Sequence, residues 1–225
     1  MAIIPKIIHY VWVGGDIPER VRSLIAHNKI FTAEYEVKIW TEQNLPRLNR
    51  FALAAYRNKK WAFVADYVRF VALYKYGGIY LDTDQKLLKS IDGLRELEFF
   101  AGWNRSKTYI YTGIIGCVPK SDIINTVLEE YENIEFSLTQ TSPAVLTRCF
   151  YDQKDSPLIK IFPSSYFYPV EIGEKESGRI LVHTYSTHLW DESWVPFVRL
   201  RRFLRRIGVI RLYHILKGIR VRLRY

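Results

Sequence analysis

Hydrophobic and polar positions follow two different periods along this chain, and each change of period marks a new element. The apolar run in residues 4–13 predicts a buried first strand, which a pair of glycines ends. Apolar residues spaced three and four apart then predict a helix over 17–30, with Pro18 placed to start it. Alternation of polar and apolar residues in 35–40 predicts a half-buried second strand.

Two helical patterns and a short strand follow. The first helical pattern covers 48–58, and the second covers 61–76, where a pair of glycines stops it. An apolar strand at 79–81 comes next and leads directly into an Asp-Thr-Asp sequence. We therefore expect these two aspartates at the carboxyl end of a strand.

The rest of the chain continues this alternation of strands and helices. The predicted elements are strands at 98–103 and 109–118, helices at 121–134 (capped by Ser121) and 142–151 (opened by Pro143), and a last strand within 178–190 that turns into a loop. This order predicts an α/β domain with a mainly parallel central sheet. Ligands of such sheets bind beyond the carboxyl ends of the strands, where the two aspartates fall.

The composition agrees with one folded domain and a small appendage. Of the 225 residues, 48% are hydrophobic and 15% are aromatic, which suffices for a real core and excludes disorder for most of the chain. The 16 Tyr and 6 Trp exceed the usual needs of a core. Either some of them line a groove for a flat, ring-shaped ligand, or packing alone accounts for them.

The sequence lacks the patterns of a signal peptide and of a membrane-spanning helix, and its two cysteines give no sign of an oxidising compartment. Cys117 and Cys149 lack the spacing of a metal site, which favours a reduced, cytoplasmic protein. The N-terminal segment has no signal-peptide pattern, and no run approaches the ~18 apolar residues of a membrane span. We expect a protein that is soluble or at most peripheral.

The net charge of +10 is concentrated at one end of the chain. Residues 196–225 hold ten of the 33 Lys and Arg residues and none of the 23 acidic ones. We divide the chain here, into a main domain of residues 1–195 and a basic tail of residues 196–225. The tail has the pattern of a basic amphipathic helix, which suits an anionic membrane surface. Packing of its apolar face on the domain and binding of nucleic acid are the alternatives.

The Asp-Thr-Asp sequence is the first candidate for chemistry. On extended backbone Asp82 and Asp84 point to the same side, and their carboxylates repel each other unless a cation lies between or near them. Hard oxygen ligands favour Mg²⁺ or Mn²⁺, which keep open positions for phosphate oxygens. A solvated turn is the alternative.

Two charged residues on the preceding helix are the second candidate. Asp66 and Arg69 are three residues apart and share a face of a helix that is otherwise apolar and aromatic. Charged residues are rarely buried there without a task or a partner. A simple intrahelical ion pair is one reading; convergence with Asp82 and Asp84 is the other.

Four segments carry a resemblance to a known family. "ADYVRFVALYKYGGIYLDTD" resembles the signature of the DXD-containing sugar transferases of glycosyltransferase family 32, which are related to the glucosylating toxins. "IPKIIHYVWVGG" resembles the opening strand of that family, "YEVKIW" its second strand, and "HLWDESW" its late His-x-Trp and Ser-Trp element. The four segments occur in the order of the family, so the resemblance covers most of the main domain.

The resemblance implies a GT-A fold, a Rossmann-like nucleotide-sugar-binding domain, and roles for individual residues. Asp84 would bind the metal directly, Asp82 the ribose and the metal's shell, and His188 the diphosphate and metal. The remaining implied donor-binding residues are Val11 and Trp12 at the nucleobase, Asp66 and Arg69 at the nucleotide-sugar, Gly78 in the turn that delivers the aspartates, and Trp190 beside His188. Asp82, Asp84 and Arg69 are the expected catalytic residues.

The function implied by the resemblance is retaining, divalent-metal-dependent transfer of a hexosyl or N-acetylhexosaminyl group. The expected cofactor is Mn²⁺ or Mg²⁺, and the expected donor is a UDP-sugar. We expect a glycan or lipid-linked acceptor in the biosynthesis of a bacterial-type surface polysaccharide (capsule, O-antigen or exopolysaccharide). The expected location is cytoplasmic, peripheral on the inner face of the cell membrane, with no nucleic-acid partner. The alternatives are a toxin-like protein glycosyltransferase and a non-enzymatic basic module that binds membrane or nucleic acid.

Three positions depart from the family pattern or extend it. Leu189 follows His188 where relatives often have a second histidine, and we expect His183 to be a strand residue packed in the core. Ser142 stands where relatives often have glycine before the proline, which leaves its contact with sugar or acceptor open. Residues 111–113 fall where an acceptor-facing strand is expected. No residue is assigned as a nucleophile.

Overall fold

The large sheet explains where every other element lies in this computed structural model. The structure describes residues 3–150, 156–171, 174 and 179–191. The strands of the large sheet are β1 (Ile7–Val11), β2 (Glu36–Trp40), β3 (Gly78–Leu81), β5 (Phe99–Trp103), β6 (Ile110–Cys117) and β7 (Ile159–Phe162). The helices are α1 (Glu19–Lys29), α2 (Arg50–Arg57), α3 (Trp61–Tyr76), α4 (Asp122–Asn133), α5 (Ser142–Phe150) and α6 (Ser164–Phe167), with a short 3₁₀ helix at Asp92–Glu96.

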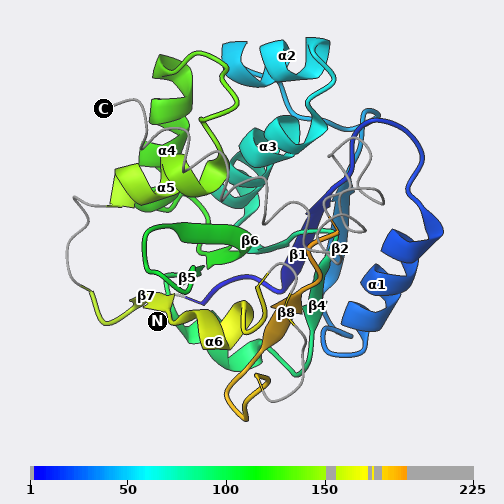
Figure 1. Cartoon of the computed structure of the whole chain (residues 1–225), viewed down its shortest axis with the longest axis vertical. Helices are drawn as coiled ribbons and strands as arrows, with labels where there is room; N and C mark the ends of the chain where they lie inside the picture. Colours follow the sequence, from blue (N-terminus) through cyan, green and yellow to red (C-terminus); the bar gives the residue numbers. More distant parts are fainter. Residues whose placement is uncertain (1–2, 151–155, 172–173, 175–178, 192–225) are drawn as a thin grey trace, which may run out of the picture.

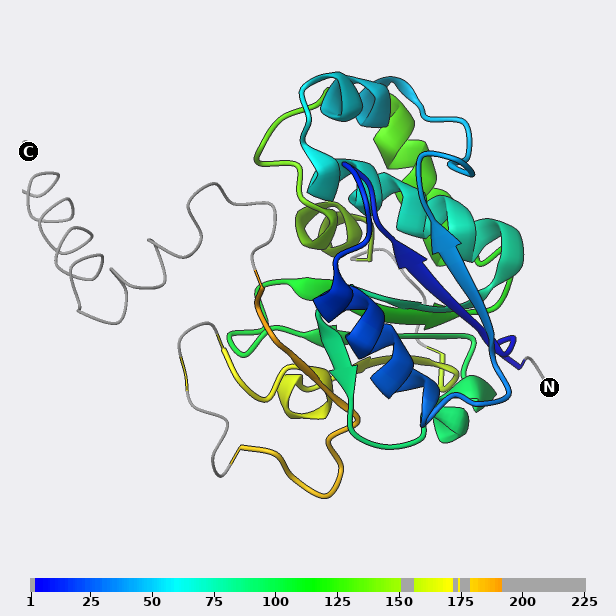
Figure 2. The ribbon, with the colours of Figure 1, turned by 90° about the vertical axis from the view of Figure 1, so that its right-hand side faces the viewer.

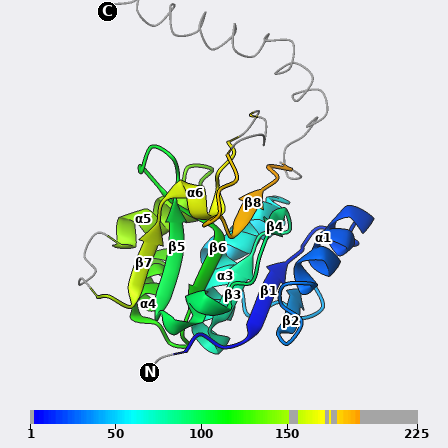
Figure 3. The ribbon, with the colours of Figure 1, turned by 90° about the horizontal axis from the view of Figure 1, so that it is seen from below.

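The strand order is β2-β1-β3-β6-β5-β7 (Figure 3). Strand β1 pairs in parallel with β2 and β3, and β5 pairs in parallel with β7. Strand β6 alone runs antiparallel to both of its neighbours. The predicted α/β class with a mainly parallel sheet is therefore confirmed, with one reversed strand at its centre.

Two hydrophobic cores cover the two faces of this sheet. Helices α2, α3, α4 and α5 lie on one face, and α1 and α6 lie on the other (Figures 1 and 2). The first core joins α3 and α4 to the sheet through side chains such as Phe70, Val127 and Tyr131. The second core includes Leu87 and Phe167. Helix α3 is buried along most of its length, which explains why its sequence is apolar on nearly all sides.

Two glycines connect α3 to β3 for steric reasons. Gly77 and Gly78 have φ angles of 61° and 95°, which residues with a side chain rarely adopt. A Cβ on Gly78 would also lie 2.6 Å from the carbonyl oxygen of Ile7. Gly78 begins β3, whereas Asp82 follows its last residue, so Gly78 sits at the end of the strand away from the aspartates. The glycine thus allows close packing of β3 on β1.

A second, two-stranded sheet escapes the sequence patterns. Strand β4 (Gln85–Leu87) pairs antiparallel with β8 (Ser186–His188). The predicted last strand is therefore only three residues long, and residues 180–185 before it lie in turn and loop. The prediction that His183 is a core strand residue is wrong: it lies half-buried in a turn, where its ring contacts that of Tyr166 at a tilt of 34° with centroids 4.5 Å apart.

The N-terminal caps of two helices differ from each other. Ser121 does stand at the N-cap of α4, but its side chain makes no capping hydrogen bond. Asn49 caps α2 by accepting from the backbone N–H of Ala52. Within the described residues, no helix is both long enough and apolar enough to cross a membrane. The predicted amphipathic tail of residues 196–225 lies outside the described residues.

Candidate active site

A pocket of about 630 Å³ opens at the carboxyl ends of β1 and β3. Its other walls come from α3, from the first half of β6 and from the start of α5. The predicted site residues that line it are Val11, Trp12, Asp66, Arg69, Asp82, Asp84, His188 and Trp190. Gly78 does not line it, because it belongs to the opposite end of β3. Residues 111–113 of β6 line it as well, and their contact with an acceptor stays a prediction.

Asp82, Asp84 and His188 form a cluster inside this pocket. Their ligand atoms all lie within 4.8 Å of one another. The Nε2 atom of His188 is 3.2 Å from Asp84 Oδ1 and 3.6 Å from Asp82 Oδ2. The backbone N–H of Gln85 donates to the carbonyl of Asp82, and the resulting turn brings both carboxylates to the end of β8. The strand itself ends at Leu81, so the turn, and not strand alternation, makes the two aspartates converge.

The ionisation of the cluster follows from burial and from its own charges. Burial opposes charge on Asp82, yet Arg69 and His188 hold the pKa of its carboxyl at about 2. Burial raises the pKa of Asp84, and the neighbouring Asp82 raises it further. Burial alone would lower the pKa of His188, but the Asp84 and Asp82 carboxylates raise it above its ordinary value. The cluster therefore favours a positive charge between its members.

Two observations show that these residues fit a hydrated divalent cation. Among the described residues, the carboxylates of Asp66, Asp82, Asp84 and Asp191 line the pocket, together with the arginines Arg20 and Arg69. Two carboxylate ligands and one imidazole are a donor set that Mn²⁺ and Mg²⁺ accept.

The second observation is a buried oxygen beside the cluster. The Gln85 Nε2 atom donates to the Phe167 carbonyl, which fixes the orientation of the amide. Its Oε1 atom then has no hydrogen-bond partner in the described part of the chain. A Cβ on Gly113 would meet this oxygen at 3.2 Å and Asp82 Oδ2 at 3.1 Å, so glycine keeps this space open. A buried orphan oxygen in that place suits the water shell of a bound cation.

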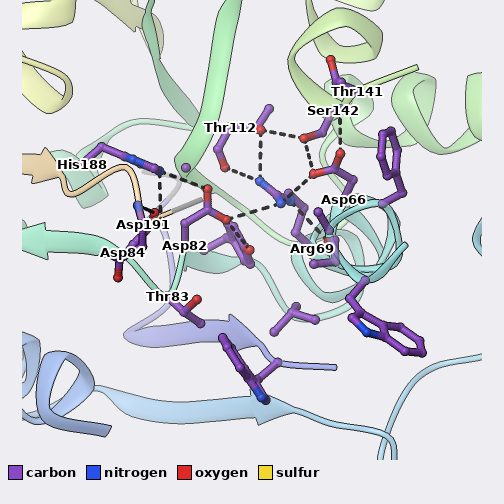
Figure 4. A pocket seen from close by; sticks show the side chains of 18 of the residues that line it. Asp66, Arg69, Asp82, Thr83, Asp84, Thr112, Thr141, Ser142, His188 and Asp191 are labelled. Carbon is purple, nitrogen blue, oxygen red and sulfur yellow. Dashed lines mark hydrogen bonds and ion pairs between the residues drawn. The ribbon is translucent and has the colours of Figure 1, made fainter. Parts of the chain in front are cut away.

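Asp66 and Arg69 form the floor of the pocket together with Thr112 and Ser142 (Figure 4). Arg69 Nη2 lies 2.7 Å from Asp66 Oδ1, and Arg69 Nη1 donates to Thr112 Oγ1. Since the Ser142 hydroxyl donates to Asp66 at 2.5 Å, the Thr112 hydroxyl donates to Ser142 at 2.7 Å. The four side chains thus close a ring of hydrogen bonds, which we call the floor ring.

Arg69 also connects the floor ring to the aspartate cluster. Its Nη2 atom lies 3.4 Å from Asp82 Oδ1, so Asp82 sits between Arg69 on one side and His188 on the other (Figure 4). Its guanidinium lies over the Tyr80 ring, whose hydroxyl donates to Asp82 at 2.7 Å. The ion pair of Asp66 and Arg69 therefore converges with Asp82 and Asp84 in one site, which is one of the two predicted arrangements.

Aromatic side chains line two opposite sides of the pocket. On the β1 side, the Trp12 indole N–H donates to the Gly15 carbonyl at 3.0 Å, and Trp61 packs directly on Gly14. On the β8 side, Tyr111 meets Trp190 edge to face with ring centroids 5.8 Å apart. Of the two explanations for the aromatic residues, a groove accounts for these side chains and core packing for others such as Tyr131.

The rim of the pocket is held by an ion pair and by backbone contacts. Arg20 of α1 pairs with Asp191, which follows β8. The backbone N–H of Asp191 donates to Asp84 Oδ2 at 2.9 Å, and that of Leu189 donates to the carbonyl of Asp84. The segment after β8 therefore lies directly against the aspartate cluster.

Sequence reasoning missed several of these residues. Arg20 lies in a helix whose pattern reports only its packing, and Gln85 is a single polar residue after the Asp-Thr-Asp sequence. The role of Ser142 was left open, although a serine before proline at the start of a helix marks a place where its side chain can bond to a neighbour. Asp191 stands inside the quoted "HLWDESW" segment without being singled out.

Comparison with known proteins identifies the class of enzyme. Residues 18–101, which hold Asp66, Arg69, Asp82 and Asp84, match the glycosyltransferase sugar-binding region containing the DXD motif. The chain is a glycosyltransferase that resembles this DXD-containing region over residues 18–101. It is 26% identical over 219 residues to an uncharacterized glycosyltransferase of Acanthamoeba polyphaga mimivirus, a match that covers 88% of this chain and 86% of the relative. The predicted family resemblance and the predicted transferase class are confirmed, and the non-enzymatic alternative is set aside.

Two further similarities concern a longer relative and a solved structure. The glycosyltransferase is 25% identical over 216 residues to inositol phosphoceramide mannosyltransferase 3 of Schizosaccharomyces pombe. That match covers 88% of this chain but only 58% of the yeast protein. The solved PaToxG glycosyltransferase aligns with a TM-score of 0.56 at 20% identity, covering 66% of this chain and 68% of the other. At this identity the structural likeness shows the fold alone, which is GT-A-like.

Proposed function

We propose that this glycosyltransferase moves a sugar from a nucleoside-diphosphate sugar to a hydroxyl group of a glycan or lipid-linked acceptor, with a divalent cation held by Asp82, Asp84 and His188. The observation that carries the proposal is the position of this cluster. It lies in one pocket with the floor ring, between two aromatic walls and at the carboxyl ends of β1 and β3. A nucleoside-diphosphate sugar needs three kinds of surface: an aromatic wall for its base, a cation site for its diphosphate, and polar side chains such as those of the floor ring for its sugar.

The chemistry requires charge stabilisation on the leaving group. The bond between the anomeric carbon and the phosphate oxygen breaks, and negative charge grows on that oxygen. A cation bound at the cluster supplies Lewis-acid stabilisation of this charge. Asp82, Asp84 and His188 hold and orient it, while the floor ring fixes Asp66 and Arg69 beneath the sugar.

Retention at the anomeric carbon is part of the proposal. Among the described residues, each carboxylate that lines the pocket already has a polar partner: Asp66 bonds to Ser142, Asp82 to Tyr80, Asp84 to the Asp191 N–H, and Asp191 to Arg20. In this arrangement, no carboxylate of the described pocket is without such a partner. This supports reaction on one face of the sugar, where the acceptor oxygen bonds to the anomeric carbon and its proton passes to the departing phosphate oxygen.

The donor and acceptor are proposed from the relatives and from the expected family habit. UDP is the nucleotide expected from the family. The yeast relative, named as a mannosyltransferase acting on inositol phosphoceramide, makes mannose the first sugar to test and a lipid-linked acceptor the first acceptor. We further propose a peripheral position on the inner face of the membrane, with the basic tail of residues 196–225 as contact, and a role in surface-polysaccharide synthesis.

The test is hydrolysis of a panel of UDP- and GDP-sugars by the full chain, with Mn²⁺, Mg²⁺ or EDTA. We expect one donor to be hydrolysed in the presence of the metal and its hydrolysis to stop in EDTA. The variant Asp82→Asn should lose this turnover, whereas Asp122→Asn, an exposed change at the start of α4, should keep it. Turnover that persisted in EDTA would contradict the cation requirement.

A further inference from the structure

The two arginines of the pocket differ in what they can still bind. Arg69 has a side chain that is only 5% exposed, and its three nitrogens all have acceptors. Nε donates to the Ala65 carbonyl, Nη1 to the carbonyl and hydroxyl of Thr112, and Nη2 faces Asp66 and Asp82. A guanidinium has five N–H donors, and this arrangement uses them. Arg69 therefore cannot bond to a ligand without giving up one of these contacts.

Arg20 has the opposite character. Its side chain is 44% exposed, it lines the same pocket, and among the described residues its carboxylate partner is Asp191. With 44% of the Arg20 side chain and 26% of the Asp191 side chain exposed, water screens this pair far more than the Arg69–Asp66 pair, so it contributes less stability. Exchange of its partner therefore costs little. Arg20 is the pocket arginine that a ligand can recruit.

The location of the pair indicates which ligand. Asp191 is tied through its backbone N–H to Asp84, so the Arg20 guanidinium lies beside the aspartate cluster, where a metal-bound diphosphate would lie. A guanidinium binds phosphate oxygens through two parallel N–H bonds. The Asp191 carboxylate pairs with Arg20 Nη1 through its Oδ2 atom and occupies that position until a phosphate replaces it.

We propose that Arg20 binds the diphosphate of the donor and exchanges Asp191 for phosphate oxygens when the donor arrives. This inference rests on the proposed function, since it assumes a nucleoside-diphosphate donor. Sequence reasoning placed Arg69 at the nucleotide-sugar; the proposal assigns the diphosphate to Arg20, a residue of α1 that no pattern singled out. Arg69 keeps a positioning role, because it orients Asp66 and Asp82.

The experiment measures binding of UDP and GDP to the full chain in Mn²⁺ by titration calorimetry, with no acceptor present. Arg20→Gln should weaken binding by about tenfold or more, the value of a charge-assisted hydrogen bond. Arg20→Lys, which keeps the charge but loses the fork, should fall between. Asp191→Asn should bind at least as tightly as the wild type, because it frees Arg20 from its competitor.

A control and a thermal melt separate this exchange from a structural role. Arg22→Gln removes a neighbouring arginine of α1 that pairs with Glu19 and does not line the pocket, and it should bind like the wild type. If the Arg20–Asp191 pair only held the rim together, Arg20→Gln and Asp191→Asn would weaken binding equally, which would overturn the proposal. Arg20→Gln affinity within about twofold of wild type, with an unchanged melt, would overturn it as well.

The failure of the proposed function has a different signature. If the wild type itself bound neither nucleotide in Mn²⁺, the nucleoside-diphosphate donor would be contradicted, and the role of Arg20 with it. If the wild type bound and Arg20→Gln bound equally well, the donor assignment would stand and only the role of Arg20 would fall. That second result is also what an arginine reserved for a phosphate on the acceptor would produce.

Discussion

The floor and the rim of the pocket are built on opposite principles. The floor ring joins α3, β6 and α5 through four side chains whose polar atoms bond to one another, and both members of its ion pair are largely shielded from water. The rim joins α1 to the segment after β8 through the more exposed pair of Arg20 and Asp191. Asp82 and Asp84 lie between these two regions.

The difference shows how one pocket can be both rigid and adaptable. A buried ion pair with complete hydrogen bonding holds its geometry, because any movement leaves an uncompensated charge away from water. An exposed pair can change partners, because solvent compensates each charge during the exchange. We infer that the floor positions the sugar-binding groups before the donor arrives and that the rim adapts to it.

Removal of Arg69 is the strongest way to break the floor. Arg69→Met leaves Asp66 and Asp82 facing each other without their shared cation, so the free energy of unfolding should fall by about 3–5 kcal/mol. Urea unfolding monitored by tryptophan fluorescence measures this. Arg50→Met, at a fully solvated position of α2, is the matched control and should stay within about 0.5 kcal/mol of wild type. Equal effects of the two variants would remove the distinction between buried and exposed pairs.

A second buried network, at the far end of α3, tests the same principle through pH. The Gly77 carbonyl can only accept, so His9 Nε2 carries the proton, at 2.8 Å, and Nδ1 accepts from the Trp40 indole. Burial lowers the pKa of His9 from 6.5 to about 4. The pKa of His9 is lower in the folded than in the unfolded protein. The neutral ring therefore makes its whole contribution to the free energy of unfolding above pH 6.5, and this contribution is lost as the pH falls toward 4.

This loss should amount to about 3 kcal/mol by pH 4. His9→Gln retains a donor toward Gly77 and has no charge to gain, so its stability should fall less steeply over the same range. Melting temperatures of both proteins at several pH values between 7 and 4 provide the measurement. Parallel curves would show that His9 does not titrate as its burial requires.

Removal of one hydroxyl from the floor ring has a smaller effect. Ser142→Ala leaves Asp66 Oδ1 and the Thr112 hydroxyl each short of a partner, at an expected cost of about 1–3 kcal/mol. Ser23→Ala, which removes an exposed hydroxyl on α1, should be nearly neutral. Chemical unfolding of the two variants side by side checks this. Ser142→Thr retains a hydroxyl and should recover part of the loss, which a ring of no importance would not show.

The smallest effect on stability is expected at the rim. Arg20→Gln removes only a partly exposed ion pair, so the free energy of unfolding should change by less than about 1 kcal/mol. The same urea titration used for Arg69→Met measures it. A loss as large as that of Arg69→Met would mean that the rim is as rigid as the floor.

Local pattern predicted most elements but not their directions. Residues 61–76 and 79–81 read correctly as helix and strand because their apolar spacing and terminal glycines reflect local backbone geometry. The reversed direction of β6 has no counterpart in a strand pattern, since alternation is the same in both directions. Strands β4 and β8, with three residues each, are too short to show a period at all.

For the candidate site, the sequence likewise predicted several residues but not the contacts between them. Helical spacing placed Asp66 and Arg69 on one face, and resemblance supplied His188, but their bonding depends on residues far along the chain. Thr112 accepts from Arg69 and Ser142 donates to Asp66 only because the fold brings β6 and α5 next to α3. The tertiary fold therefore supplies the acceptors that occupy the N–H donors of Arg69, and it leaves Arg20 as the pocket arginine that a ligand can recruit.

Binding of Mn²⁺ in the presence of UDP or GDP shows whether Asp82, Asp84 and His188 hold a cation, and it does not require an acceptor. Isothermal titration calorimetry of the wild type, Asp84→Asn and the remote Asp122→Asn gives three affinities. We expect Asp84→Asn to lose at least about 100-fold in Mn²⁺ affinity and Asp122→Asn to bind like the wild type. Wild-type Mn²⁺ affinity in Asp84→Asn would contradict this expectation.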